Sequence, residues 1–287
     1  MGAQTGTGAA ARRMLLGSRL RRLREASGVS REAAGYSIRA SESKISRMEL
    51  GRVGFKQRDV ADLLTLYGVG EGVERTELLA LVGEANSPAW WHGYGDAVPA
   101  WFQTYLGLEE AARTLSGYEV QFVPGLLQTE EYARAVVLVG NPGASPEEVE
   151  RRVDVRMRRQ RILDGDRGPE LLLIVDEAAL RRPTGGSEVM RRQLARLVEL
   201  SDLPRLTLQV MPLGRGELAA DSGSFTLLGF PEQDLPDVVY VEQFTTALYL
   251  DRPAEVAEYA AALDRLRAHS LPPEPTRDLL AAVRASL

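Results

Sequence analysis

Residues 30–51 read SREAAGYSIRASESKISRMELG and contain two short helical patterns separated by a turn. Ser30 and Ser41 each precede one of these patterns, and serine is a preferred residue at the position that caps a helix. We therefore expect a helix over 31–37 and a second helix that begins after Ser41. Gly51 follows the second pattern and is expected to end it.

The apolar and small residues of this stretch indicate how the two helices pack. Ala34 and Gly35 are small enough to let the helices approach each other closely. Ile45 and Met48 lie three residues apart and are expected to hold the second helix against a core. The remaining outward face of that helix is polar throughout.

Three further amphipathic segments flank this pair. Apolar residues recur at helical spacing over 16–26, 57–67 and 73–85. Together, the five short helices predict a compact all-helical domain over residues 12–85. We expect residues 1–11, which begin with small uncharged side chains and show no signal peptide, to form a disordered tail.

The charge of the chain is distributed unevenly. The 287 residues include 35 basic and 40 acidic side chains, with a formal net charge of −5. Residues 1–70 hold thirteen basic and six acidic side chains, whereas the remainder holds 22 basic and 34 acidic ones. This asymmetry is typical of a polyanion-binding module joined to a second module, and the length fits two domains.

Residues 16–69, with the ISRMELG ending at Gly51, resemble the lambda-repressor-like, or xenobiotic-response-element, family of helix-turn-helix regulators. The resemblance implies that the helix over about 41–50 enters the major groove of double-stranded DNA. The residues that it places near base edges are Glu42, Ser43, Lys44 and Arg47. The residues that it assigns to backbone phosphates are Arg31, Ser41, Arg52 and Lys56.

The chemistry of these side chains fits the roles that the resemblance implies. The guanidinium of Arg47 can pair with O6 and N7 of guanine. Lys44 can serve a base or a phosphate, Ser43 can contact either, and Glu42 can accept from the amino group of cytosine. One departure is Arg39, where the family often has glycine. Because arginine tolerates a positive φ poorly, either the turn is built differently or Arg39 itself faces a phosphate.

The composition and motifs argue against catalysis. Cysteine is absent and histidine occurs only at His92 and His269, so no metal-ligand spacing is present. No catalytic or nucleotide-binding motif is found, and no apolar stretch is long enough to cross a bilayer. We expect a cytoplasmic, non-enzymatic protein without cofactor or metal, associated with the nucleoid when bound to DNA.

Residues 86–101 form an aromatic-rich linker between the two expected domains. Interdomain packing is one explanation of the aromatic cluster, and a ligand cavity is another, since pockets are often lined by aromatic side chains. The candidate pocket residues are Trp90, Trp91, Trp101, Gln128 and Tyr132.

Residues 102–287 are expected to form a mixed α+β domain with a largely antiparallel sheet, which serves regulation, sensing or dimerisation. The predicted strands are 118–123, 171–175, 206–211, 225–230, 238–242 and 247–250. Helices are predicted over 146–163, 188–200, 255–268 and 276–286, and Ser145 begins a capping box. Loops between the last three strands are too short for helical crossovers, so these strands should be antiparallel.

Three charged or polar motifs of this domain have both a structural and a functional interpretation. PGLLQTEEY, 124–132, forms either a joint between a strand and a helix or a site for a ligand or partner. Asp176 and Glu177 favour a helix cap over paired catalytic carboxylates. The arginines of 151–161 favour a solvated face, and a second DNA or partner contact is the alternative.

The segments FVPGLLQTEEYARA (122–135) and VDEAALRRPTGG (175–186) resemble the C-terminal domain of unknown function of actinobacterial helix-turn-helix regulators. In that family the gene commonly neighbours one for a small acidic protein, which implies an antitoxin-like role.

We therefore expect a sequence-specific transcriptional regulator. A homodimer is expected because one module reads few bases. A small ligand or a small acidic partner protein is expected to act through the C-terminal domain. The alternative is an antitoxin-like interaction partner whose DNA binding serves autoregulation.

Overall fold

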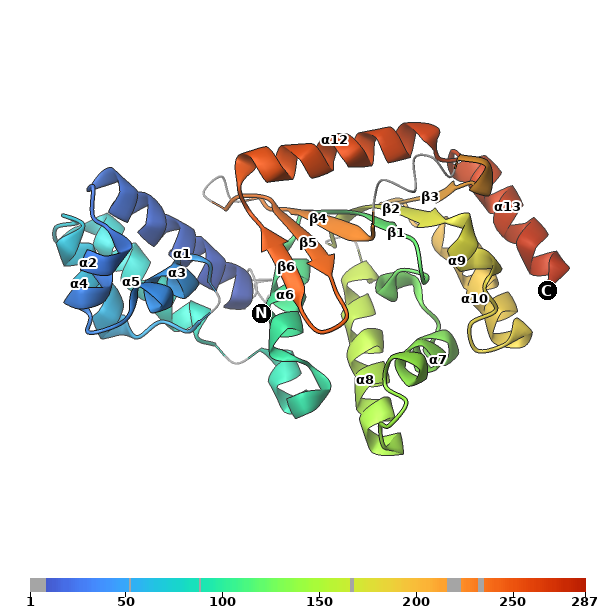
Figure 1. Cartoon of the computed structure of the whole chain (residues 1–287), viewed down its shortest axis with the longest axis horizontal. Coiled ribbons are helices and arrows are strands. Elements are labelled where there is room, and N and C mark those ends of the chain that lie inside the picture. The colour runs from blue at the N-terminus through green and yellow to red at the C-terminus, as the bar shows by residue number, and fades with distance from the viewer. Residues whose placement is uncertain (1–8, 52, 88, 166–167, 216–222, 232–234) are drawn as a thin grey trace. The chain divides into compact units, whose positions relative to one another are not determined.

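The computed structural model describes the chain except for residues 1–8, 52, 88, 166–167, 216–222 and 232–234 (Figure 1). Contacts between residues divide the chain into two compact units. The first comprises the chain up to Gly93, Phe102–Ala111 and Phe230–Pro236, and the second comprises Tyr94–Trp101, Ala112–Gly229 and Asp237–Leu287.

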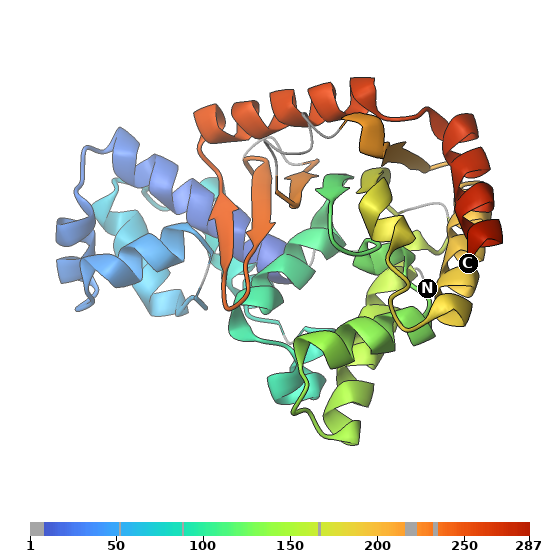
Figure 2. The same ribbon diagram turned by 45° about the vertical axis from the view of Figure 1, so that its right-hand side comes forward.

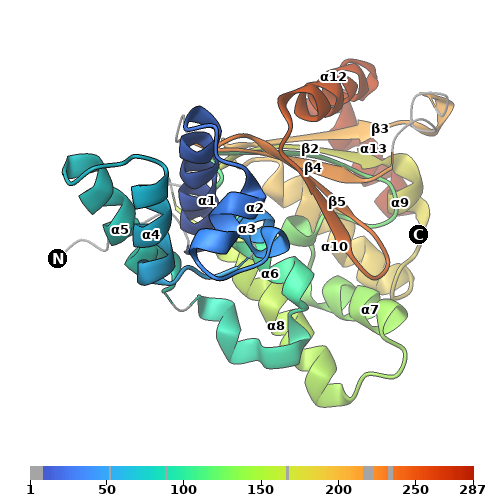
Figure 3. The ribbon, with the colours of Figure 1, turned by 60° about the vertical axis from the view of Figure 1, so that its left-hand side comes forward.

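The first unit contains the five expected helices, drawn from blue to cyan in Figure 3. They are α1 (Ala9–Ala26), α2 (Arg31–Ser37), α3 (Glu42–Glu49), α4 (Gln57–Leu66) and α5 (Val73–Ala85). The 3₁₀ helix η1 (Trp90–Ala97) follows them. Of the predicted N-terminal tail, residues 1–8 lie outside the described part, whereas residues 9–11 are already helical. Alanine at all three positions has the highest helix propensity, which favours this extension of α1.

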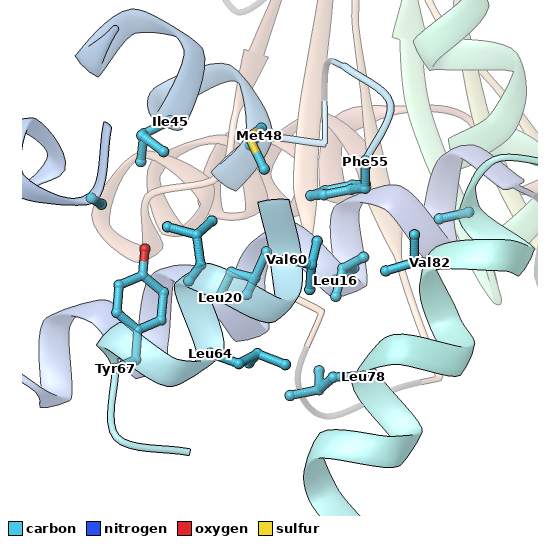
Figure 4. Packing of buried hydrophobic residues seen from close by; sticks show 13 residues of the cluster. Leu16, Leu20, Ile45, Met48, Phe55, Val60, Leu64, Tyr67, Leu78 and Val82 are labelled. Carbon is cyan, nitrogen blue, oxygen red and sulfur yellow. The ribbon is translucent and has the colours of Figure 1, made fainter. Parts of the chain in front are cut away.

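One apolar core joins the five helices (Figure 4). It contains Leu16 and Leu20 from α1, Ile45 and Met48 from α3, and residues of α4 and α5. A Cβ atom at Gly17 would lie only 2.4 Å from the carbonyl oxygen of Met48. The close approach of α1 and α3 therefore requires glycine at this position, and it fixes the inner face of α3.

The second unit is built on a six-stranded sheet in the order β3-β2-β1-β4-β5-β6. The strands are β1 (Thr114–Glu119), β2 (Glu170–Asp176), β3 (Leu206–Met211), β4 (Phe225–Gly229), β5 (Val238–Glu242) and β6 (Ala247–Leu250). β1, β2 and β3 are mutually parallel, whereas β4, β5 and β6 are antiparallel to their neighbours. The α+β class and the antiparallel pairing of the last three strands are confirmed.

Helices cover both faces of this sheet. They are α7 (Glu130–Gly140), α8 (Pro146–Arg159), α9 (Glu177–Arg181), α10 (Ser187–Leu200), α12 (Pro253–His269) and α13 (Pro273–Ser286), with short 3₁₀ helices η2 (Gly125–Leu127), η3 (Gln160–Leu163) and η4 (Leu213–Arg215). α12 crosses one face and α7, α8 and α10 lie on the other, while α13 packs beside α10 (Figures 1 and 2). Helix α6 (Ala100–Ala111) crosses the boundary between the two units.

The first strand differs from its predicted range of 118–123. β1 ends at Glu119 because the next backbone groups bond to side chains instead of a neighbouring strand. The N–H of Val120 donates to the hydroxyl of Ser224 at 3.2 Å, and the N–H of Val123 donates to the hydroxyl of Tyr132 at 3.2 Å. These two bonds direct the chain away from the sheet.

The first residues of α8, α12 and α13 agree with local capping signals in the sequence. The capping box at Ser145 is confirmed. α12 and α13 begin two and three residues earlier than predicted, since Pro253 and Pro273 each occupy a first helical position, where proline is favoured.

Candidate DNA-binding surface and the C-terminal domain

The relative placement of α2 and α3 is fixed by two caps and one glycine. Ser30 and Ser41 each accept a hydrogen bond from the N–H three residues later, at 3.1 and 3.2 Å. A Cβ atom at Gly35 would lie 2.8 Å from the carbonyl oxygen of Ala40. The expected close approach at Gly35 is therefore confirmed, and the start of α3 is held against α2.

Arg39 occupies the left-handed position of the turn that ends α2, with φ of +55°. The N–H of Arg39 donates to the carbonyl of Tyr36 at 3.1 Å, and the N–H of Ala40 donates to that of Gly35 at 2.8 Å. This pair of bonds is the Schellman motif, in which glycine is the usual residue. The turn thus keeps its ordinary geometry, and arginine adopts a conformation that costs about 1–2 kcal/mol.

The outward face of α3 presents three of the four side chains assigned to base edges. Glu42, Ser43 and Arg47 are exposed, whereas Ile45 and Met48 are buried in the core. The Nε of Arg47 donates to the carbonyl of Ser43 at 3.4 Å. Its guanidinium therefore lies along the surface of the helix, over the turn that precedes it.

Lys44, the fourth of these side chains, is engaged inside the protein. Its Nζ lies 2.6 Å from Oδ2 of Asp59 in the first turn of α4, and both side chains are partly buried. This ion pair ties α3 to α4. Lys44 can reach DNA only by releasing or sharing Asp59.

The residues assigned to phosphates have different surroundings. Lys56 is exposed and directly precedes α4, whereas Arg52 lies outside the described residues. The hydroxyl of exposed Ser41 caps α3. The Nε of Arg31 lies 2.9 Å from Oε2 of Glu49, so this arginine also has a partner within the protein.

Glu49 is a buried carboxylate that was not among the site residues predicted from the sequence. Its side chain is only 3% exposed and is bound by Arg24 of α1 as well as by Arg31 of α2. The hydrogen bonds of Glu49 raise the pKa of Arg24 above its ordinary value against the opposing effect of burial. Burial, followed by the charge of Glu49, raises the pKa of Tyr67 to about 12. The signal in the sequence was an acidic residue at a core-facing position, next to Met48.

The tryptophans of the candidate pocket are divided between the two units. Trp90 and Trp91 belong to the first unit, where their rings meet edge to face at a centroid distance of 5.4 Å. Trp101 belongs to the second unit, and its carbonyl accepts a hydrogen bond from the hydroxyl of Tyr249 at 2.6 Å. A shared ligand pocket stays a prediction.

Gln128 and Tyr132, the polar residues of that candidate pocket, are bonded to the backbone of the second unit. The Nε2 of Gln128 donates to the carbonyl of Val123 at 2.7 Å, and the hydroxyl of Tyr132 accepts from the N–H of the same residue. Gln193 of α10 binds the backbone of Leu127 and Thr129. PGLLQTEEY therefore forms a structural joint, one of the two interpretations of this motif.

The described residues include no cluster of histidine, aspartate and glutamate that could hold a metal ion. The helices in this part of the chain include none that is long and apolar enough to cross a membrane.

Residues 102–282 match the family described as domain of unknown function (DUF5753). The chain belongs to this family. Residues 15–78, which run from α1 into α5, match a helix-turn-helix domain family of the xenobiotic-response-element or lambda-repressor type. No curated protein and no solved structure matches the chain.

Within the DUF5753 domain, Asp176 and Glu177 have structural partners. Asp176 accepts from the backbone N–H two residues later and from the hydroxyl of Tyr118, each at 2.8 Å. Glu177 pairs with Arg181 and accepts from the N–H of Leu213 at 3.0 Å. The expected helix cap is confirmed at Asp176, and both carboxylates stabilise the loops after β2 and β3.

The arginines of 151–161 do not form the solvated face that their spacing favoured. Only Arg161 is exposed, and the arginines at 151, 152, 156, 158 and 159 are half-buried. Val149, Val153 and Val155 of the same helix are buried, so α8 is covered on more than one side. The long arginine stems accordingly lie along protein surface instead of extending into water.

Proposed function

We propose that this protein is a sequence-specific transcriptional regulator that reads the major groove with α3. The proposal rests on the difference between the two faces of this helix, one of which is buried in the core while the other is exposed and polar. Ile45 and Met48 bind it to the core, while Glu42, Ser43 and Arg47 stand exposed together on a helix whose start is capped. A rigid helix with exposed polar side chains is what base recognition in the major groove requires.

The charges near α3 support the same proposal. Lys56 is exposed at the start of α4, and Arg39 is exposed in the turn before α3. Arg39 precedes α3 in the chain and Lys56 follows it, and in this proposal both contact phosphates on either side of the groove. Such contacts position the protein on DNA, whereas Arg47 and Ser43 supply the choice of base.

The protein acts in this proposal as a homodimer and by binding alone, without chemical catalysis. One helix contacts only a few base pairs, and two copies read enough sequence for useful discrimination. Two half-sites with centres about 34–36 Å apart, or one helical turn, would accommodate such a dimer.

The experiment that tests this function is a binding titration of the full chain against duplex DNA from upstream of its own gene. A scrambled duplex of equal length serves as the control, and both are measured over a series of salt concentrations. We expect the natural duplex to bind more tightly than the scrambled one at each salt concentration, and both affinities to fall steeply with salt. Equal affinities for the two duplexes would contradict sequence-specific recognition.

A further inference from the structure

The sheet of the DUF5753 domain reverses its strand order at β1. β2 and β3 lie on one side of β1, and β4, β5 and β6 lie on the other. β1 therefore ends between the parallel strand β2 and the antiparallel strand β4. Glu119 is the last residue of β1 and therefore stands at this position.

The sheet face that carries Glu119 has polar side chains on β4 and β5. In the pairing register, Gly117 lies opposite Thr226, which lies opposite Tyr240. Since side chains alternate along a strand, Glu119 and Glu242, each two residues further on, point to this same face. The hydroxyl of Tyr240 donates to Glu242 at 2.8 Å. The other face is apolar and packs against α12.

Three arginines lie on one side of α8, and the charges of two of them act on acids of this polar face. Arg152, Arg156 and Arg159 are spaced by four and three residues and therefore share one side of the helix. α8 lies on the sheet face opposite α12 (Figure 1). The charge of Arg159 acts on Glu119, and the charges of Arg156 and Glu242 act on each other.

The positive charges of this group are not fully balanced. Arg156 is half-buried and has no hydrogen bond or ion pair with any described residue, and the Nε of Arg152 is buried without a hydrogen-bond partner in the same part of the chain. Burial, and then the charges of Arg159 and Arg152, lower the pKa of Arg156 to about 10. Half-buried like charges held together are stabilised by an anion between them.

The helix that carries the arginines is fixed at its end. The Nε2 of Gln160 donates to the carbonyls of Gly125 and Gln128, at 3.1 and 2.7 Å. A Cβ atom at Gly125 would lie 3.3 Å from Nη1 of Arg159, so the guanidinium passes directly over this glycine. The three arginines are thus held on a firmly anchored helix, as a preformed binding site requires.

We propose that these three arginines of α8 bind a compact organic anion through its carboxylate or phosphate group. Glu119 and Glu242, across from them on the sheet, accept hydrogen bonds from hydroxyl or ammonium groups of the same molecule. The ligand class is therefore a small polar metabolite with one strong anionic group and adjacent donors. The site lies wholly within the DUF5753 domain and is independent of the DNA contacts of α3.

Calorimetric titration of the full chain without DNA tests this site. Inorganic phosphate and succinate are the two probes, each titrated against a chloride background of equal ionic strength. We expect one or both to bind at one site per chain. Binding of phosphate alone indicates a phosphoryl ligand, and binding of succinate alone indicates a carboxylate ligand.

Substitutions on α8 locate the bound probe. Arg156→Gln and Arg152→Gln are each expected to weaken binding by about tenfold or more, because a hydrogen bond between charged groups contributes about 1.5–3 kcal/mol. Arg161→Gln, which removes an exposed arginine just beyond the helix, is expected to leave the affinity within about twofold of the wild type. If neither probe binds the wild-type chain, or if both α8 variants bind the same probe as tightly as the wild type, the proposal is overturned.

Discussion

Lys44 in α3 and Asp59 in α4 form an ion pair of 2.6 Å, so a side chain of the candidate DNA-reading helix is neutralised within its own domain. Asp59 is partly buried and lies in the first turn of its helix, where a carboxylate is favoured by the helix dipole. The pair stabilises the packing of α3 on α4. A contact between Lys44 and DNA is also made less favourable, because Lys44 must first release or share Asp59.

Replacing Asp59 by asparagine should therefore increase affinity for DNA. The change removes one negative charge and frees Lys44, and a gain of about 1 kcal/mol corresponds to roughly fivefold tighter binding. Asp62→Asn is the matched control, because it removes an exposed charge from the same helix without touching Lys44. Fluorescence anisotropy at fixed salt measures both. An equal change in the two variants would show that the ion pair does not restrain Lys44.

Arg39→Gly should stabilise the helix-turn-helix domain. Glycine adopts the observed φ of +55° without steric cost, although it also adds entropy to the unfolded chain. The balance of these effects is a gain of roughly 0.5–1 kcal/mol in the free energy of unfolding. Arg39→Ala removes the same side chain but keeps the strain, so it should show no such gain. Chemical denaturation compares the two, and equal stabilities would contradict the strain.

Glu49→Gln should destabilise the same domain strongly. The substitution removes the buried charge that pairs with Arg24, whose side chain is only 9% exposed, and leaves only the exposed carboxylate of Glu25 beside it. Breaking a buried pair in this way costs about 3–5 kcal/mol. Glu25→Gln is the control, since it removes the exposed carboxylate next to Arg24 and should cost less than about 1 kcal/mol. Similar losses in the two variants would show that Glu49 is not the main partner.

The stability of the DUF5753 domain should depend on the ionisation of Glu119. Burial raises its pKa from 4.5 to about 7, with the charge of Glu242 adding to this effect and Ser224 and Arg159 opposing it. Because the folded state holds the proton more tightly than the unfolded state, stability is lost as the pH rises from about 4.5 through 7.

Glu119→Gln removes this loss. The variant should gain on the order of 2 kcal/mol over the wild type at pH 8 and show little gain at pH 4.5. Urea denaturation at the two pH values measures the difference, and Glu258→Gln, on the exposed side of α12, is the control. A gain of the same size at both pH values would exclude the ionisation of Glu119 as its cause.

Local signals were sufficient for the elements that position α3. The caps at Ser30 and Ser41 and the close approach at Gly35 depend on neighbours within one or two turns, and the helical spacing of Ile45 and Met48 is enough to predict that they face a core. The sequence showed that Arg39 stands where the family often has glycine. It did not show whether Arg39 adopts the left-handed conformation of that glycine. Whether a turn accepts a strained residue depends on the packing on both sides of it.

Partners that are distant in the sequence could not be predicted in this way. Glu49 meets Arg24 from a helix 25 residues earlier, and the end of β1 depends on Ser224, whose hydroxyl accepts from the N–H of Val120. The arginines of α8 have the same helical spacing whether they form a solvated face or a binding site, so the spacing alone could not distinguish the two. Only the folded structure brings the charges of Arg159 and Arg156 near those of Glu119 and Glu242 on the sheet.

In the proposed function, Arg47 on α3 reads a base. The most direct test selects binding sites from a random DNA pool with the wild type, with Arg47→Ala, and with Arg265→Ala, which removes an exposed arginine from α12 instead. We expect Arg47→Ala to lose preference at one base position of each half-site, a guanine in the wild-type motif, at a cost of about 1–3 kcal/mol, while Arg265→Ala selects the wild-type motif. If Arg47→Ala selects the wild-type motif with unchanged affinity, α3 does not read DNA through Arg47 and the proposed base recognition is contradicted.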